Sequence, residues 1–278
     1  MKKGIILMCC TLLLASCGND ATQKATEKLS VAQAAFERGN YNEAKIQLDS
    51  IKLLYPKAFD VRREGNKLMQ QVELKEQQQS LAYLDSMMQT KQEELKAIVG
   101  AYTLEKDATY QEEGNYFWPT QTVEKNLHRS FLRFQVNEQG VMIMTSIYCG
   151  RSHIHHFAVK VTAPDGTFAE TPASTDSYET TDLGEKIEKA DFTMGSDGNV
   201  MGFLYLNRDK NIKVEYIGER KYSFNMTPAD RLALTKVYEL SQLLSSMEQI
   251  KKEAEEAKLK IGFVKKLIEK RSTEEPVK

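Results

Sequence analysis

The fold of this chain is decided at its centre, by the stretch LRFQVNEQGVMIMTSIY at residues 132–148. Its first five residues alternate apolar and polar side chains, which is the period of a strand with one buried face. Polar residues and a glycine at 137–140 predict a turn, and the run that follows is apolar on both faces, as in a central strand. The stretch therefore predicts two neighbouring antiparallel strands within a β region.

This β region extends on both sides, over residues 101–226. Residues 157–161 alternate again, and short apolar runs at 203–205 and 212–216 predict further strands between turns rich in glycine, aspartate and asparagine. About seven or eight short strands of this kind indicate an antiparallel β-sandwich or an open barrel. Residues 171–182 are polar and rich in serine and threonine, and predict a mobile loop.

Helical patterns flank the β region. Residues 66–100 carry apolar side chains at alternating spacings of three and four, which predicts a coiled-coil helix. A second such pattern covers residues 227–271 and begins with the helix-start signal Thr227-Pro228-Ala229-Asp230; residues 272–278 form a polar tail. The predicted fold class is α+β, with the long C-terminal helix pairing back on the first arm. A homodimer formed through the two arms is the alternative.

A helical hairpin precedes the first arm, over residues 28–65. Gly39 lies at the expected turn, Tyr41 and Ala44 open the second helix, and Pro56 follows its end. This spacing resembles one tetratricopeptide repeat, in which glycine permits the turn and alanine lets the two helices approach closely. No second copy is legible, so the resemblance implies a single helical hairpin packed on its neighbours.

The N-terminus carries an export signal. Lys2 and Lys3 form a short basic region, and the apolar run that follows is too short to span a bilayer comfortably. Leu14-Ala15-Ser16-Cys17 resembles the lipobox of bacterial lipoproteins. The resemblance implies that residues 1–16 are removed as a signal peptide and that Cys17 is acylated and anchors the chain in a membrane. Residues 17–27 are small and polar and predict a flexible tether.

The residues after the cysteine bear on which membrane holds the anchor. Gly18 and Asn19 are followed by a single acid at Asp20, which gives neither a clear inner-membrane retention signal nor an acidic surface-export signal. We therefore expect the periplasmic face of the outer membrane, with exposure at the cell surface as the alternative.

Charge and cysteine usage limit the remaining possibilities. The chain has 38 Lys and Arg residues against 39 Asp and Glu, so no basic excess of the whole chain attracts nucleic acid or anionic lipid. Of its four cysteines, two leave with the signal peptide and Cys17 is acylated. Only Cys149 then remains, which excludes an intramolecular disulfide. Cys149 ends an apolar run and is interpreted as a structural thiol.

The histidines are the candidate metal ligands. If residues 153–156 form a strand, His153 and His155 point to the same face, and His128 could supply a third ligand. His155 would share that face with Phe157 and Val159, however, so hydrogen-bonded structural histidines are the alternative interpretation. No cofactor is predicted.

Two further groups of residues are candidate sites. Tyr116, Phe117 and Trp118 form the densest aromatic cluster and either bind a partner or ligand or close one end of the β core. Ser50 and Ser86 follow aspartates in a pattern that resembles the Asp-[Ser/Thr]-apolar O-glycosylation signal of some Gram-negative bacteria, although both lie in predicted helices.

No catalytic motif is legible in the sequence. It contains no Gly-x-Ser-x-Gly, no His-Glu-x-x-His and no phosphate-binding glycine loop. The sequence therefore favours a non-enzymatic envelope scaffold or protein-interaction module that binds a protein partner. A glycan- or metal-binding β domain on a helical stalk, with or without enzymatic activity, is the alternative.

Overall fold

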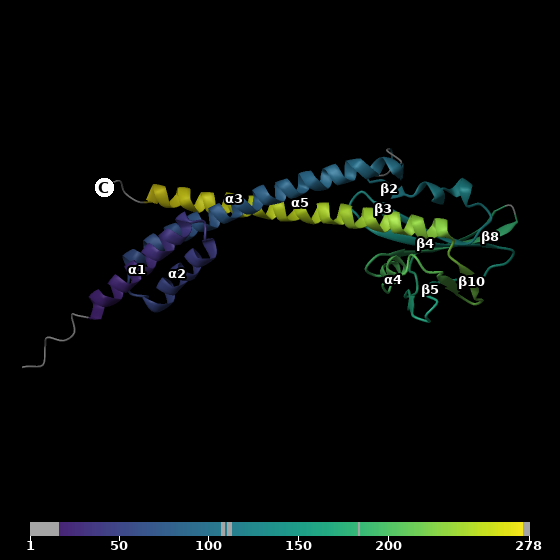
Figure 1. The fold of residues 1–278 in the computed structure, drawn as a ribbon, viewed down its shortest axis with the longest axis horizontal. Helices are drawn as coiled ribbons and strands as arrows, with labels where there is room; N and C mark the ends of the chain where they lie inside the picture. Colours follow the sequence, from purple (N-terminus) through teal and green to yellow (C-terminus); the bar gives the residue numbers. More distant parts are fainter. Residues whose placement is uncertain (1–16, 107–108, 110–112, 183, 275–278) are drawn as a thin grey trace, which may run out of the picture. The chain divides into compact units, whose positions relative to one another are not determined.

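The structure, a computed structural model, describes residues 17–106, 109, 113–182 and 184–274 (Figure 1). It confirms the α+β class: helices precede and follow an antiparallel β region. The chain divides into two compact units. Unit 1 takes its residues from Met1–Ser86 and Lys252–Lys278, and unit 2 is Met87–Lys251. The predicted signal peptide and most of the polar tail lie outside the described residues.

Unit 1 is helical and contains the predicted hairpin. Helix α1 (Cys17–Glu37) and helix α2 (Tyr41–Leu54) are joined by a turn in which Gly39 has a φ of +74°. The Asn40 side chain caps α2 by accepting the Glu43 N–H at 3.2 Å. Small and aliphatic side chains fill the core between these helices and the first part of α3, and the alanines allow close packing: Ala25, Ala32, Ala35, Ala44, Leu48, Ile51, Ala58, Leu68 and Val72.

The predicted tether at residues 17–27 differs from the structure, because α1 already begins at Cys17. Ala25 is fully buried in the unit 1 core, so this segment gains packing energy that its polar composition does not reveal. Lys24 also pairs with Asp20 one turn earlier, which is a helix-stabilising spacing. No helix among the described residues is both long and apolar enough to cross a membrane.

The two long helices have almost the predicted bounds. Helix α3 runs over Phe59–Ile98, which joins the end of the hairpin region to the predicted arm, and α5 runs over Pro228–Glu274. At the start of α5, the Thr227 hydroxyl accepts the Asp230 N–H at 3.2 Å and Pro228 takes the first helical position. Each of these helices contributes residues to both units. In unit 1, Lys258 of α5 lies close enough to Asp85 of α3 for their charges to interact, as expected for a C-terminal helix that returns to the arm.

Unit 2 contains the β region, in two antiparallel sheets. The first sheet has the strand order β1-β2-β3-β4-β8-β7 and the second has β10-β9-β5-β6. A short 3-10 segment, η1 (Val99–Ala101), precedes β1, and two more, η2 (Pro119–Gln121) and η3 (Val123–Lys125), lie between β2 and β3. The strand bounds are β1 Thr103–Glu105, β2 Asn115–Phe117, β3 Phe131–Asn137, β4 Met142–Gly150, β5 Ala158–Thr162, β6 Phe168–Glu170, β7 Ser177–Asp182, β8 Glu185–Thr193, β9 Lys213–Ile217 and β10 Tyr222–Asn225.

One hydrophobic core joins the two sheets, as in a sandwich rather than an open barrel. Phe134 and Met144 of the first sheet and Val161 and Tyr216 of the second are completely buried in it, together with residues of α4 and the first half of α5. The buried Tyr216 hydroxyl donates across the core to the carbonyls of Phe131 and Ile147. Phe131 and Ile147 are cross-strand partners of β3 and β4, so a single side chain links the sheets at a defined register.

Three segments of unit 2 correct the sequence-based expectations. Residues 203–205, predicted as a strand, lie in helix α4 (Val200–Leu206), whose N-terminus is fixed by Asp197 accepting the Met201 N–H at 2.7 Å. Val200, Met201 and Leu204 recur at helical spacing on its buried face. Within the predicted loop 171–182, the last six residues form β7. Residues 153–156 are a loop rather than a strand, and His155 has a φ of +52°.

Candidate functional site

The outer face of the six-stranded sheet is hollowed into a groove. Strand alternation sends Phe134, Met144 and Ala190 to the core and their sequence neighbours to the opposite face. The outward side chains form cross-strand rows, of which Arg133, Thr145 and Asp191 are one. Two adjoining cavities, of about 450 and 220 Å³, lie on this face and share Arg133, Ile147 and Lys189. We call the two together the outer groove.

One wall of the outer groove is the segment 119–129, which two buried amides hold in place. Strand β2 is short, so part of the β3 edge lacks a strand partner, and the Gln121 side chain takes that position. Its amide donates to the Leu132 carbonyl at 2.9 Å and accepts the Phe134 N–H at 2.8 Å. The Asn126 amide donates to two carbonyls of its own segment. These bonds satisfy backbone groups that would otherwise be buried unpaired, and they position the wall.

The floor of the outer groove mixes apolar and charged side chains. Phe131 lies beneath the Arg129 guanidinium, 4.5 Å from its ring centre, and Ile147 and Ile187 add apolar surface. The Lys189 side chain is exposed and has no polar partner among the described residues, and Asp191 has a buried carboxylate oxygen without one. Such a surface can bind a ligand that brings both apolar and hydrogen-bonding groups.

Cys149, Glu185 and His128 meet inside the outer groove. The Glu185 carboxylate accepts from His128 Nδ1 at 2.5 Å and from the Cys149 thiol at 3.3 Å. The bond from His128, and then that from Cys149, lowers the pKa of Glu185. Partial burial, together with the neighbouring Glu185 charge, raises the pKa of Cys149 to about 11. The thiol is therefore protonated at neutral pH, which does not suit a nucleophile and agrees with the structural role predicted for it.

On the inner side of the same sheet, a second polar group forms around Glu188 of β8; we call it the His–Glu cluster (His153, His155, His156, Glu179 and Glu188). Glu188 is buried, and one of its oxygens accepts the N–H groups of Ile154 and His155 at 2.7 and 3.0 Å. Its other oxygen accepts the backbone N–H and Nδ1 of His156, both at 2.9 Å. Burial alone would raise the pKa of Glu188, but these bonds outweigh it and lower the pKa to about 2.

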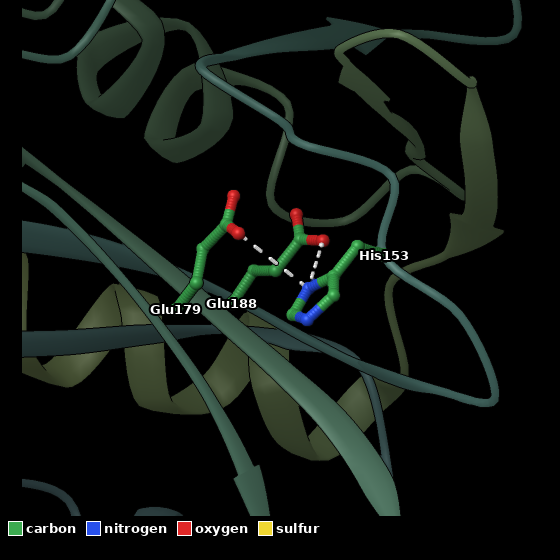
Figure 2. A group of neighbouring side chains, drawn as sticks. All are labelled: His153, Glu179 and Glu188. Carbon is green, nitrogen blue, oxygen red and sulfur yellow. Dashed lines mark hydrogen bonds and ion pairs between the residues drawn. The ribbon is translucent and has the colours of Figure 1, made fainter.

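Figure 2 shows three members of the cluster, with the His153 ring beside the carboxylates of Glu179 and Glu188. His153 Nδ1 is 3.1 Å from a Glu188 oxygen and 3.6 Å from a Glu179 oxygen. Ligand atoms of a tetrahedral zinc ion lie about 3.4 Å apart, so this spacing is compatible with a metal. The Glu188 oxygen already accepts two backbone N–H groups, however, and a cation would have to compete with them.

The predicted metal ligands are brought together only in part. His153 and His155 stack with their ring centres 5.3 Å apart, and His155 Nδ1 is bonded to Glu179 at 2.9 Å. Their proximity comes from the loop conformation and not from strand alternation. His128 does not join them, because its Nδ1 is bonded to Glu185 in the outer groove. The one candidate metal group among the described residues is His153, Glu179 and Glu188.

Sequence reasoning missed an arrangement that includes Ser146, His156 and Glu188. The Ser146 hydroxyl is 2.8 Å from His156 Nε2, and His156 Nδ1 bonds Glu188, as in a serine hydrolase triad. All three residues are buried, His156 is stacked on Tyr216, and none of them lines the outer groove. A substrate has no route to this hydroxyl, so the arrangement acts as a buried hydrogen-bond network.

The other predicted site residues lie as follows. Phe117 is buried with the Arg133 guanidinium over its ring, and Trp118 and Tyr116 pack against the core of unit 2, which matches the alternative that this cluster closes the core. Ser50 and Ser86 are in helices α2 and α3, and the Ser50 hydroxyl donates to the Ile46 carbonyl. Cys17 is the first residue of α1.

No protein-family model matches this chain, and no curated protein or solved structure matches it either.

Proposed function

We propose that this chain is a lipid-anchored protein of the bacterial cell envelope whose β region binds a partner protein and catalyses no reaction. The lipobox-like Leu14–Cys17 supports the anchor, and the outer groove supports the binding role. Ser146, which is bonded to His156, is buried, and the pKa of Cys149 is raised, so neither side chain is suited to act as a nucleophile.

One observation carries the binding role: the outer groove borders an open sheet edge. Strand β7 is the last strand of its sheet, and Tyr178 and Thr180 of β7 also line the groove. Unpaired N–H and C=O groups along an edge strand can accept an extended segment of another protein as an additional strand. The groove would then receive side chains of that segment.

The pairing of β7 with β8 identifies which backbone N–H and C=O groups of β7 remain available to another strand. The Asp191 N–H donates to the Asp176 carbonyl at 2.9 Å, so residues 176, 178 and 180 direct their backbone groups to β8. Glu179 and Thr181 consequently direct theirs away from β8. Proline at position 181 would remove an outward N–H without breaking the pairing with β8.

The test is site-specific crosslinking in membranes. A photoreactive phenylalanine analogue in place of Tyr178, which is exposed at the groove, should give a discrete crosslinked protein. When Thr181→Pro is added, the yield of this crosslink should fall by at least about tenfold. Proline removes the outward N–H of residue 181, so an added strand loses a hydrogen bond and no longer fits the edge. Thr181→Ala removes the hydroxyl that Lys186 contacts but keeps the N–H, and should leave the yield unchanged.

An equal yield in Thr181→Pro, with unchanged melting temperature, would exclude strand addition. Absence of any crosslink at Tyr178 would count against the protein-binding role as a whole.

A small ligand such as a glycan fragment is the second candidate, since the larger cavity of about 450 Å³ is in the range of small-molecule sites. A glycan fragment that raises the melting temperature of the whole chain equally in Thr181→Pro and in the unmodified protein would favour it. For the metal alternative, a zinc titration should give a signal that His153→Ala removes.

A further inference from the structure

One end of the unit 1 hairpin exposes large apolar side chains. Leu53 and Leu54 close α2, Phe59 opens α3, and their exposed fractions are 79, 62 and 72 %. Only the four residues 55–58 separate them in the chain. Exposed apolar side chains that gather in this way mark a surface that contacts something other than water. We call Lys52, Leu53, Leu54, Lys57 and Phe59 the hairpin end.

The hairpin end lies at the same end of the hairpin as the start of α1. Helices α1 and α2 are antiparallel, and Lys28 Nζ of α1 is 3.1 Å from Gln47 of α2. From this pair, α1 leads back to Cys17 and α2 leads forward to Leu54, and Lys24 of α1 lies near Tyr55, the residue that follows α2. Ala58 packs in the same core as Ala25 of α1, which agrees with this alignment. The exposed leucines and Phe59 therefore lie at the end of the hairpin where α1 begins.

The charge at this end is locally positive, in contrast to the chain as a whole. Lys52 and Lys57 are exposed and have no ion-pair partner among the described residues. The nearby Asp60 is already paired with Arg63. Lysines beside apolar side chains can extend their ammonium groups to anionic headgroups while the apolar side chains enter the acyl boundary.

We propose that the hairpin end inserts into the surface of an anionic lipid bilayer and provides a second membrane contact beside the acylated cysteine. The inference rests on the proposed anchoring, because acyl chains on Cys17 would hold this end of unit 1 at a lipid surface. An apolar surface flanked by lysines adds to membrane affinity independently of acyl chains. The contact would also fix the orientation of unit 1 on the membrane, which acyl chains alone leave free.

The test uses a chain that begins at residue 17 and carries Cys17→Ser, so that neither the leader nor an acyl group can bind lipid. This protein should float with vesicles of phosphatidylethanolamine and phosphatidylglycerol. Combined replacement of Leu53, Leu54 and Phe59 by alanine should reduce the vesicle affinity on the order of a hundredfold, through lost apolar burial. All three side chains are exposed, so the fold should be unchanged.

Two further variants test whether the position of the apolar side chains and the charge of the lysines contribute to vesicle binding. Leu259→Ala with Phe263→Ala removes exposed apolar side chains from α5 and should leave vesicle binding unchanged. Lys52→Gln with Lys57→Gln should weaken binding on the order of tenfold for these anionic vesicles, and have little effect on the weaker binding to phosphatidylcholine vesicles.

Binding that is unaffected by the Leu53, Leu54 and Phe59 replacements, or no binding to either vesicle, would overturn the inference. A concentration-dependent dimer that the same replacements abolish would overturn it in favour of a second copy of this chain as the occupant. If the proposed acylation of Cys17 is wrong, the whole chain will incorporate no fatty acid at Cys17. That outcome is independent of whether the hairpin end binds vesicles.

Discussion

At the scale of single residues, Glu188 organises the loop that contains three of the four histidines. Its carboxylate accepts the N–H groups of three consecutive residues, 154–156, and this is possible because His155 adopts a left-handed conformation. Left-handed backbone is costly for a residue other than glycine, and hydrogen bonds to a buried charge offset that cost. The loop conformation and the charge on Glu188 therefore depend on one another.

We predict that Glu188→Gln destabilises the protein by about 3 kcal/mol at neutral pH. Its pKa falls from 4.5 to about 2 on folding, so its contribution is complete above about pH 4.5 and is lost as the pH falls towards 2. Denaturant unfolding at several pH values measures the free energy of unfolding of the variant and of the unmodified protein. The difference from the unmodified protein should shrink below pH 4.5.

Glu179→Gln is the matched control for this prediction. Glu179 is in the adjacent strand and also contacts His153 and His155, but it is exposed, so its loss should cost less than about 1 kcal/mol. A pH-independent difference for Glu188→Gln, or an equal loss for both variants, would show that the buried charge is not the source of the stability.

The histidine cluster could be recognised in the sequence, but its central residue could not. Histidines are rare in this chain, which directs attention to His153 and His155. Glu188 is one of several acids and lysines in β8, and only the pairing of β8 with β4 and β7 brings it under the loop. Ser146 likewise lies in an apolar run, and its contact with His156 depends on a turn that the strand prediction excluded.

At the scale of elements, the β3–β4 turn is built against helix α5. The hydroxyls of Ser241 and Ser245 donate to the Gly140 carbonyl at 2.7 and 3.0 Å. Gly140 has a φ of +89°, and a Cβ there would lie 2.3 Å from the Ser245 backbone nitrogen. Glycine is therefore required at this position for two reasons, the backbone conformation and the approach of the helix.

We predict that Gly140→Ala lowers the free energy of unfolding by about 3 kcal/mol or more, since backbone strain and a clash with rigid helix backbone add together. Gly166→Ala is the control: Gly166 has a similar φ of +85° but no atom within 4 Å of the added Cβ. It should cost only about 1 kcal/mol. Thermal melting compares them, and equal losses would mean that the contact with α5 contributes nothing.

The elements that the sequence predicts well are those with local signals. The start of α5 carries a capping threonine and a first-turn proline, and β3 and β4 carry clear alternation, so their bounds are close to those observed. Helix α4 was missed because its seven residues are too few to display a helical period against neighbouring turns. The first turns of α1 were missed because the burial of Ala25 depends on α2 and α3, which local composition does not report.

At the scale of the whole molecule, the proposed membrane anchor would determine where the outer groove and the hairpin end act. We predict that Cys17→Ala abolishes fatty-acid labelling of the whole chain. In a chain that reaches the envelope without residues 1–16, the same replacement should move most of the protein from the membrane to the soluble fraction, because stable anchoring needs two or more acyl chains or a second signal. The residual membrane-bound fraction should fall further when Leu53, Leu54 and Phe59 are also replaced.

Cys149→Ala is the control for the labelling. Cys149 is half-buried and its thiol is bonded to Glu185, so this variant should keep its label and its membrane association. Labelling that persists in Cys17→Ala and disappears in Cys149→Ala would reverse the assignment of the anchor.

The division of the chain into two units has a consequence for biosynthesis. Unit 1 is discontinuous, and unit 2 is inserted between its two segments. The second segment of unit 1 follows unit 2 in the chain, so unit 1 cannot be completed until all of unit 2 has been synthesised. Folding of unit 2 shortens the effective loop between the segments, which lowers the entropic cost of bringing them together. A chain interrupted before residue 252 would therefore carry a complete β sandwich and an incomplete helical unit.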